Sequence, residues 1–245
     1  MKKVLSIAGS DPSGGAGIQA DIKTITAHKL YAMAVIVSLT AQNTTAVSGV
    51  LDCLPEFVES QIDSVLSDIT PDAIKLGMLS NANIMHSVAK MLKQYNCKNI
   101  VLDPVMVATT GGRLMDDNAL GVYIDELFAL ARVVTPNLPE ASVLSGIEIK
   151  NIDDMRAAAI KISSYGCQSV LIKGGHFVGN ATDLLYENGE FTEFSAIKID
   201  TKNTHGTGCT LSSAIACNIA SGLGVKDSVK NAKDYVTNAL KNAIA

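Results

Sequence analysis

The chain has 245 residues, of which 47% are hydrophobic and 18% are charged, and its formal net charge is −4. This length suits one large α/β domain, and the composition excludes a disordered or fibrous protein. A general nucleic-acid-binding protein would be basic, and an anionic membrane surface would repel an acidic chain, so neither is expected as the main partner.

The five cysteines are odd in number and contain no C-x-x-C pair, so we expect neither a disulfide framework nor a zinc site. Reduced thiols are typical of the cytoplasm, where we expect this protein to act. The apolar run before Ser10 is too short for a signal-peptide core, and the stretch 31–39 is too short to span a bilayer.

Strand-like and helix-like segments alternate along the chain. Short runs of branched apolar residues predict buried strands, whereas apolar residues spaced three or four apart predict helices. In chain order we predict a strand over 4–8, a helix over 14–28, a strand over 34–39, a helix marked by Val58, Ile62, Val65 and Ile69, a strand over 73–76, a helix over 84–95, and strands over 99–102 and 132–135.

The second half continues the alternation. A helix marked by Ile152, Met155, Ala159 and Ile162 precedes a strand over 169–172. Two short strands over 184–186 and 191–194 flank Asn188-Gly189, which is a strong hairpin signal, and two helices end the chain. Strands separated by helices predict a mostly parallel sheet with helices on both faces. No linker or repeat interrupts the pattern, so we expect one domain over 1–245.

Polar and glycine-rich clusters follow most of the predicted strands. They cover 9–17, 40–45, 77–80, 103–113, 137–140 and 173–176. Open α/β sheets bind ligands beyond the carboxyl ends of their strands. We therefore expect these clusters to meet at one edge of the sheet.

The first cluster, IAGSDPSGGAGIQAD at 7–21, is a glycine-rich turn that enters a helix. It is not a Walker A loop, because no Lys-Ser/Thr pair follows the glycines. Gly15-x-Gly17-x-x-Ala20 matches a dinucleotide fingerprint, but the second strand lacks the acidic residue that this fingerprint requires. A tight structural turn and a nicotinamide-dependent oxidoreductase are therefore both alternatives here.

The segment NTHGTGCT at 203–210 opens a helix rich in small residues. Gly206, Thr207 and Gly208 would leave free amides at the positive end of that helix, which suits the charge on a transferring phosphoryl group. Cys209 lies in the first turn, where a thiol pKa can be lowered. A glycine-rich cap with an inert cysteine is an equal alternative on these residues alone.

Four polar residues stand at strand ends: Asp103, Asn137, Glu140 and Lys173. Carboxylates suit magnesium, and a lysine suits the phosphates of ATP. His176 and His205 fall at the same edge without a metal-ligand partner at useful spacing, so we expect no metal–histidine site.

Seven blocks together resemble the hydroxymethylpyrimidine/phosphomethylpyrimidine kinase family of thiamine biosynthesis, within the ribokinase superfamily. Besides the two segments already quoted, they are LTAQNT at 39–44, KLGML at 75–79, LDPVMVAT at 102–109, TPNLPEA at 135–141 and LIKGGH at 171–176. The resemblance implies a ribokinase-like three-layer α/β/α sandwich, usually a homodimer. It implies ATP-dependent phosphorylation of 4-amino-5-hydroxymethyl-2-methylpyrimidine and then of its monophosphate.

The resemblance also implies roles for residues of this chain. Cys209 with Gly206, Thr207 and Gly208 would be catalytic, and Asp103 and Glu140 would hold Mg²⁺. Segment 108–114, with Gly111-Gly112, would be a flexible lid. The pyrimidine would contact Gly9, Asp21, Gln42, Met78 and Val105, and the nucleotide phosphates Asn137, Glu140 and Lys173.

Many ribokinase relatives carry an aspartate, the general base, where this chain has Cys209. A thiolate can serve instead if the helix end lowers its pKa. The nearest alternative is a pyridoxal kinase of the same superfamily, because its substrate is also a hydroxymethylated ring. A non-catalytic ligand-binding regulator on this scaffold is a further alternative.

Overall fold

The computed structural model describes residues 1–106, 119–175, 181–196, 199, 201 and 203–243. Nine strands form one sheet in the order β3-β2-β1-β4-β5-β6-β7-β8-β9. The six central strands are parallel, whereas β3, β8 and β9 each run antiparallel to a neighbour. The strands are β1 (Lys3–Ser10), β2 (Tyr31–Gln42), β3 (Val47–Asp52), β4 (Ala73–Leu76), β5 (Ile100–Leu102), β6 (Ala131–Val134), β7 (Ser169–Ile172), β8 (Ala181–Glu187) and β9 (Glu190–Ala196).

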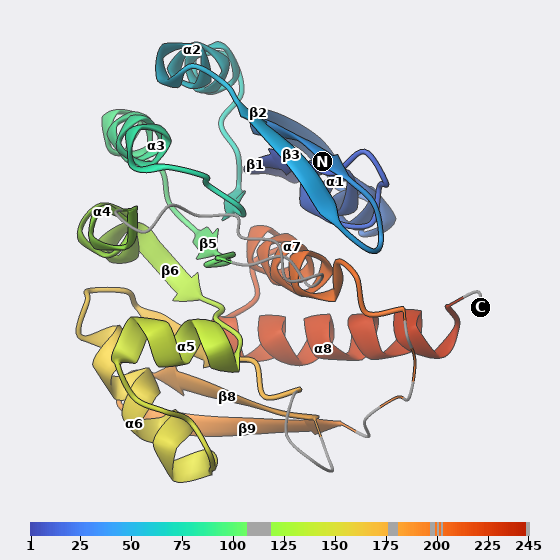
Figure 1. Cartoon of the computed structure of the whole chain (residues 1–245), viewed down its shortest axis with the longest axis vertical. Coiled ribbons are helices and arrows are strands. Elements are labelled where there is room, and N and C mark those ends of the chain that lie inside the picture. Colours follow the sequence, from blue (N-terminus) through green and yellow to red (C-terminus); the bar gives the residue numbers. More distant parts are fainter. Residues whose placement is uncertain (107–118, 176–180, 197–198, 200, 202, 244–245) are drawn as a thin grey trace.

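Helices cover both faces of the sheet, which confirms the predicted three-layer architecture (Figure 1). One face packs on α2 (Pro55–Leu66), α3 (Ala82–Gln94), α4 (Ala119–Leu127), α5 (Leu138–Ser145) and α6 (Ile152–Ser163). The other packs on α1 (Gly17–Ala27), α7 (Thr207–Ala220) and α8 (Val225–Lys241). A short 3-10 turn, η1 (Phe128–Leu130), links α4 to β6.

Alternation along the central strands decides which side chains meet each helix layer. In β4, Ile74 and Leu76 join the core under α2–α6, whereas Lys75 faces the opposite layer and contacts α1. In β1, Leu5 and Ile7 point to the first core, and Ser6 also reaches α1. The period of two therefore places two polar side chains against α1 and α7.

One strand of the sheet, β3, was not predicted from the sequence. β3 pairs antiparallel with the far half of β2, so the 40–45 cluster is the end of a hairpin arm instead of a simple loop. Most side chains of β3 are exposed, and the strand therefore lacks the alternating apolar pattern that marks a half-buried strand. Figure 1 shows this arm projecting at one end of the sheet.

Candidate functional site

A cavity lies at the carboxyl ends of the parallel strands, where the sequence analysis expected the polar clusters to meet. It is lined by Gly9, Ser10, Asp11, Ala16, Gly17, Thr40, Gln42, Met78, Asp103, Val105, Asn137, Glu140, Lys173, His205, Gly206, Gly208 and Cys209. Eleven of the thirteen predicted site residues are in this set. Asp21 and Thr207 are not, and the predicted lid over 108–114 and His176 lie outside the described residues.

The amino end of α7 forms one wall of the cavity. Gly206 precedes the helix with φ of 77°, and no side chain caps the first amides. A Cβ on Gly206 would lie 1.7 Å from the carbonyl oxygen of Gly15, so only glycine fits there. The free amides and the positive end of the helix dipole therefore face the cavity as a preformed anion site. Thr207 instead donates its hydroxyl to the Thr204 carbonyl at 2.9 Å.

Two segments far apart in sequence are tied together beside this helix end. The Nε2 of His205 lies 2.8 Å from Asp11 Oδ2, and the same carboxylate accepts the amides of Ser13 and Ala16. A Cβ on Gly15 would come within 2.4 Å of the His205 ring, so the turn before α7 rests directly on the glycine-rich loop. The sequence analysis placed His205 at this edge but found no partner for it, because Asp11 is 194 residues away.

Asp103 and Lys173 form a buried ion pair next to the α7 end. Lys173 Nζ lies 2.8 Å from Asp103 Oδ1, which also accepts the Thr135 hydroxyl, while Ser212 donates to Oδ2 at 3.1 Å. Burial would raise the pKa of Asp103, but the charges of Lys173 and Lys75 lower it overall. Asp103 is therefore ionised, and both members of the ion pair line the cavity.

Glu140 and Asn137 face the cavity as part of a helix cap. Asn137 Oδ1 accepts the Glu140 amide at 2.9 Å, and Glu140 Oε2 accepts the Asn137 amide at 2.8 Å, which makes a capping box for α5. Burial raises the pKa of Glu140 to about 7; Lys173 opposes this rise and Asp103 adds to it. A bound cation would favour the ionised form of this carboxyl group.

Two carboxylates and an amide oxygen suit Mg²⁺, which binds through one or two carboxylates and takes water and substrate phosphates as its other ligands. Asp103 and Glu140 both line the cavity, so these residues fit the ion. In the described part of the chain no group of three or more His, Cys, Asp or Glu forms a complete protein-ligand cage. The donor set therefore fits an ion that keeps several non-protein ligands.

Glu140 makes stability depend on pH in a defined direction. Its folded pKa of about 7 exceeds the ordinary 4.5, so between these values the folded state holds a proton that the unfolded state has lost. The wild type should lose about 3 kcal/mol of unfolding free energy relative to Glu140→Gln as pH rises from 4.5 to 8. Urea titrations of both proteins without magnesium measure this difference, and a constant difference would contradict it.

The surroundings of Cys209 oppose the thiolate that a helix start would favour. The thiol lines the cavity and accepts a hydrogen bond from the Gly17 amide. Burial nevertheless raises its pKa to about 11, against the lowering effect of Lys75 and with further increases from Asp21 and Asp103. The helix end alone does not produce a thiolate at neutral pH, because desolvation and two nearby carboxylates outweigh it.

Asp21 also lies elsewhere than expected. Its side chain is fully buried below the cavity, and its two oxygens accept hydrogen bonds from Ser6, Lys75 and Ser213. With these partners the carboxylate does not line the cavity. Contact between Asp21 and a pyrimidine stays a prediction.

The opposite end of the cavity is apolar. Met78 is 7% exposed and packs with Val105 and with Val47 of β3, the strand that the sequence analysis missed. A Cβ on Gly9 would lie 3.1 Å from the Met78 sulfur, so glycine gives the thioether its room. Gln42 closes this end, with its Oε1 accepting the Thr40 hydroxyl at 3.2 Å. A flat ring with one polar edge fits such a pocket.

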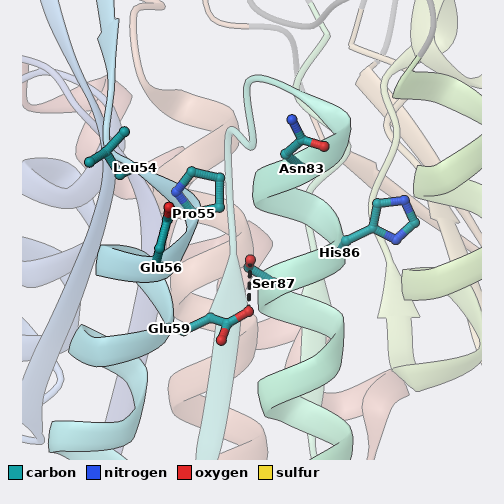
Figure 2. A pocket seen from close by; sticks show the side chains of 7 residues that line it. All are labelled: Leu54, Pro55, Glu56, Glu59, Asn83, His86 and Ser87. Carbon is teal, nitrogen blue, oxygen red and sulfur yellow. Dashed lines mark hydrogen bonds between the residues drawn. The ribbon is translucent and has the colours of Figure 1, made fainter.

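A second, open hollow lies between α2 and α3, on the outside of the helix layer (Figure 2). Glu59 accepts the Ser87 hydroxyl at 3.0 Å and pairs with Lys90, while His86 pairs with Glu126. These groups are satisfied by one another and lie on helices away from the strand ends. None of the predicted site residues lines this hollow, whereas eleven of them line the first cavity.

Comparison with known proteins identifies the family. A family model described as phosphomethylpyrimidine kinase matches residues 11–245. The chain belongs to the phosphomethylpyrimidine kinase family. This membership confirms the resemblance seen in the sequence, and it leaves the oxidoreductase alternative without support.

Some relatives are longer bifunctional proteins, and others are kinases of similar length to this chain. The chain is 46% identical over 241 residues to the thiamine biosynthesis bifunctional protein ThiED of Geobacter sulfurreducens, covering 98% of this chain but 49% of that protein. It therefore spans about half the length of that relative. The crystal structure of phosphomethylpyrimidine kinase from Clostridium difficile 630 is 42% identical with a TM-score of 0.88, covering 98% of this chain and all of the other. The ADP complex of Bacillus subtilis pyridoxal kinase is 38% identical with a TM-score of 0.92, covering 100% and 93%.

None of the helices in the described ranges combines the length and the apolarity needed to cross a bilayer.

Proposed function

We propose that this protein phosphorylates 4-amino-5-hydroxymethyl-2-methylpyrimidine with ATP and then phosphorylates the resulting monophosphate to the diphosphate. One observation carries the proposal: a preformed anion site at α7, with Lys173 and two carboxylates, shares a cavity with a ring-sized apolar end closed by Gln42. A phosphate donor and a heteroaromatic alcohol can therefore meet in that cavity. Family membership supports the same activity.

The apolar end of the cavity would recognise the pyrimidine by its shape and by hydrogen bonds. Met78 and Val105 would hold the ring faces, with Gly9 giving the space. The Gln42 amide can donate to a ring nitrogen and accept from an exocyclic amine, which suits an aminopyrimidine edge. The hydroxymethyl group would then point toward Cys209 and the α7 amides.

The phosphate end would stabilise the charge that develops on the transferring group. The amides of Gly208 and Cys209 and the dipole of α7 are fixed before substrate arrives, so they reorganise little during the reaction. Lys173, held by Asp103 at 2.8 Å, would contact the nucleotide phosphates with Asn137. Asp103 and Glu140 would hold Mg²⁺, which when bound neutralises phosphate charge.

Cys209 would assist proton transfer from the alcohol in the first step. The two steps should differ in how much they depend on Cys209. The second acceptor is a phosphate oxygen that is already anionic, whereas the first is a neutral hydroxyl. Cys209→Ala should lower kcat of the first step about tenfold and leave the second within about threefold. The loss is modest because a thiol with a pKa of about 11 is protonated at neutral pH.

Steady-state rates with purified alcohol and purified monophosphate measure this difference. Cys217→Ala is the matched control, since that cysteine is buried in the same helix away from the cavity. Equal losses in both steps would remove Cys209 from proton transfer.

A phosphate-transfer assay tests the activity itself. ATP, Mg²⁺ and the pyrimidine alcohol should yield monophosphate and then diphosphate, resolved by chromatography. Absence of turnover with this alcohol and with other hydroxymethylated rings would instead favour a ligand-binding regulator.

Pyridoxal is the second candidate substrate, because a pyridoxal kinase superposes on this fold with a TM-score of 0.92. The ring of pyridoxal, like the pyrimidine, carries a hydroxymethyl group. Gln42 and Met78 favour the aminopyrimidine at the ring end. Values of kcat/KM for both alcohols, measured side by side, decide between them.

We further propose that the chain forms one domain, acts in the cytoplasm and assembles as a homodimer. Five free thiols suit a reducing compartment, and a single nine-stranded sheet suits one domain. Exposed apolar side chains cluster on the β2–β3 arm and the start of α2, where a second copy would cover them: Leu39, Val50, Leu51, Leu54 and Phe57. Analytical ultracentrifugation tests the assembly.

A further inference from the structure

A fully buried ion pair lies beneath the amino end of α7. Lys75 Nζ is 2.8 and 3.0 Å from the two oxygens of Asp21, and neither side chain is exposed. The same carboxylate accepts the hydroxyl of Ser6 at 2.6 Å and that of Ser213 at 2.7 Å. Strands β1 and β4 and helices α1 and α7 therefore meet at one carboxylate.

The surrounding chain makes room for the lysine. A Cβ on Gly77 would lie 2.6 Å from Lys75 Nζ and 2.9 Å from the Cβ of Ala8. Gly77 belongs to the KLGML block, which the proposed chemistry uses only through Met78. An apolar pair of the same volume would fill this space at less cost, because desolvating two charges tends to outweigh their attraction. The pair therefore needs an explanation beyond stability.

The pair connects to the reacting end of the cavity through α7. Ser213 lies four residues after Cys209, on the same face of the helix. The neighbouring Ser212 donates to Asp103, so two consecutive serines fix the first turns of α7 to two different acids. Displacing Asp21 would free one of these two attachments.

The pair also lies near Cys209, because Asp21 binds the hydroxyl of Ser213, one helical turn after Cys209. Burial alone would lower the pKa of Lys75, but the charges of Asp21, Cys209 and Asp103 and the hydrogen bond to Asp21 raise it. Lys75 is accordingly a permanent cation. Among the groups that lower the pKa of the Cys209 thiol, Lys75 has the largest effect.

We propose that Lys75 and Asp21 are positioning residues for phosphoryl transfer: the pair anchors the first turns of α7 and places a cation beside the Cys209 thiol. Its catalytic consequence rests on the proposed function, whereas its effect on the thiol does not. Four charged groups face Cys209, from four elements or their ends: Lys75, Asp21, Asp103 and Lys173.

The test measures alkylation of Cys209 by iodoacetamide between pH 7 and 10, followed on its peptide by mass spectrometry. Lys75→Met should slow alkylation about tenfold at a fixed pH, because the thiolate loses the cation that favours it most. Asp21→Asn should speed it, because an anion is removed. The Lys75→Met, Asp21→Asn double variant should return to within about threefold of wild type.

Opposite signs separate this role from structural damage, which would move both single variants in one direction. If both change alkylation in the same direction and the double variant does not recover, the proposal is wrong. Circular dichroism shows whether Lys75→Met folds. If it does not, the two other variants still test the proposal: alkylation should be faster than wild type in Asp21→Asn and within about threefold of wild type in the double variant. Lys90→Met, which removes an exposed ion pair with Glu59, is the control and should match wild type.

Kinetics form the second readout. In the double variant, kcat of the first step should fall at least fivefold while KM for ATP stays within twofold, because the anchor acts on α7 and touches no ligand. An unchanged kcat would overturn the anchoring role. If no acceptor turns over even in wild type, the proposed function fails, and the alkylation result still stands by itself.

Discussion

Replacing Gly206 by alanine should lower kcat/KM at least about a hundredfold. Gly206 holds a left-handed conformation with φ of 77°. The carbonyl oxygen of Gly15 occupies the space that a side chain would need, 1.7 Å from the position of an ideal Cβ. An alanine must push the glycine-rich loop and the start of α7 apart. The amides that form the anion site would then no longer aim at the transferring phosphoryl group.

Gly146→Ala is the matched control for this variant. Gly146 has a similar φ of 71°, at the end of α5, but nothing lies within 4 Å of its ideal Cβ. Gly146→Ala should lose about 1–2 kcal/mol from the strained backbone and keep its activity. Gly206→Ala should lose more stability, because its Cβ also clashes with Gly15, and it should lose activity as well. Thermal unfolding and initial rates measure the two effects. Equal activity in both variants would show that the contact between the two loops is not needed for catalysis.

Replacing Lys173 by methionine should lower kcat about a thousandfold and also destabilise the protein. The ammonium is the cation that lines the cavity beside the α7 amides, and it neutralises Asp103 at 2.8 Å. Removing it leaves a buried carboxylate without its partner, which typically costs about 3–5 kcal/mol. The catalytic loss is separate, because the phosphates would lose a fixed positive charge.

A second variant separates these two losses. Lys173→Met combined with Asp103→Asn removes the unpaired charge, so unfolding free energy should recover. Activity should stay low, because the cation is still missing and Asp103 is also a proposed ligand of Mg²⁺. Lys233→Met is the control: it breaks a Lys–Asp pair of similar burial, at 2.6 Å to Asp183, outside the cavity lining. It should lose stability but keep kcat within about tenfold. Recovery of activity in the double variant would mean that Lys173 serves stability alone.

The sequence could predict the site where the signal was local. Asp103, Asn137 and Lys173 each follow a short buried strand, and the rule that parallel strands end at one edge brings them together. The strands 73–76 and 169–172 were predicted with the boundaries that the structure shows. The helix α5 was missed, although its capping box, Asn137 with Glu140, was present as a signal.

The failures concern contacts between distant segments. The partners of Asp21 lie 15, 54 and 192 residues away, and no spacing in the sequence reveals that a carboxylate will be enclosed by all three. The surroundings of Cys209 could not be read from the sequence for a related reason. A helix start predicts a lower thiol pKa, but the desolvation that raises it depends on how deeply the packed chain encloses the sulfur.

The β2–β3 arm gives the cavity two ends of unequal stiffness. Val47 helps to pack Met78, yet β3 is bonded to the sheet through β2 alone, with most of its side chains in solvent. Amide hydrogens of such an outermost ribbon exchange in small local openings, whereas those of β1 and β4 exchange only when the core opens. Under the proposed function, amino-acid changes in the arm should therefore alter which ring is accepted and leave the phosphate end intact. Substrate choice and phosphoryl transfer would then depend on different parts of the fold.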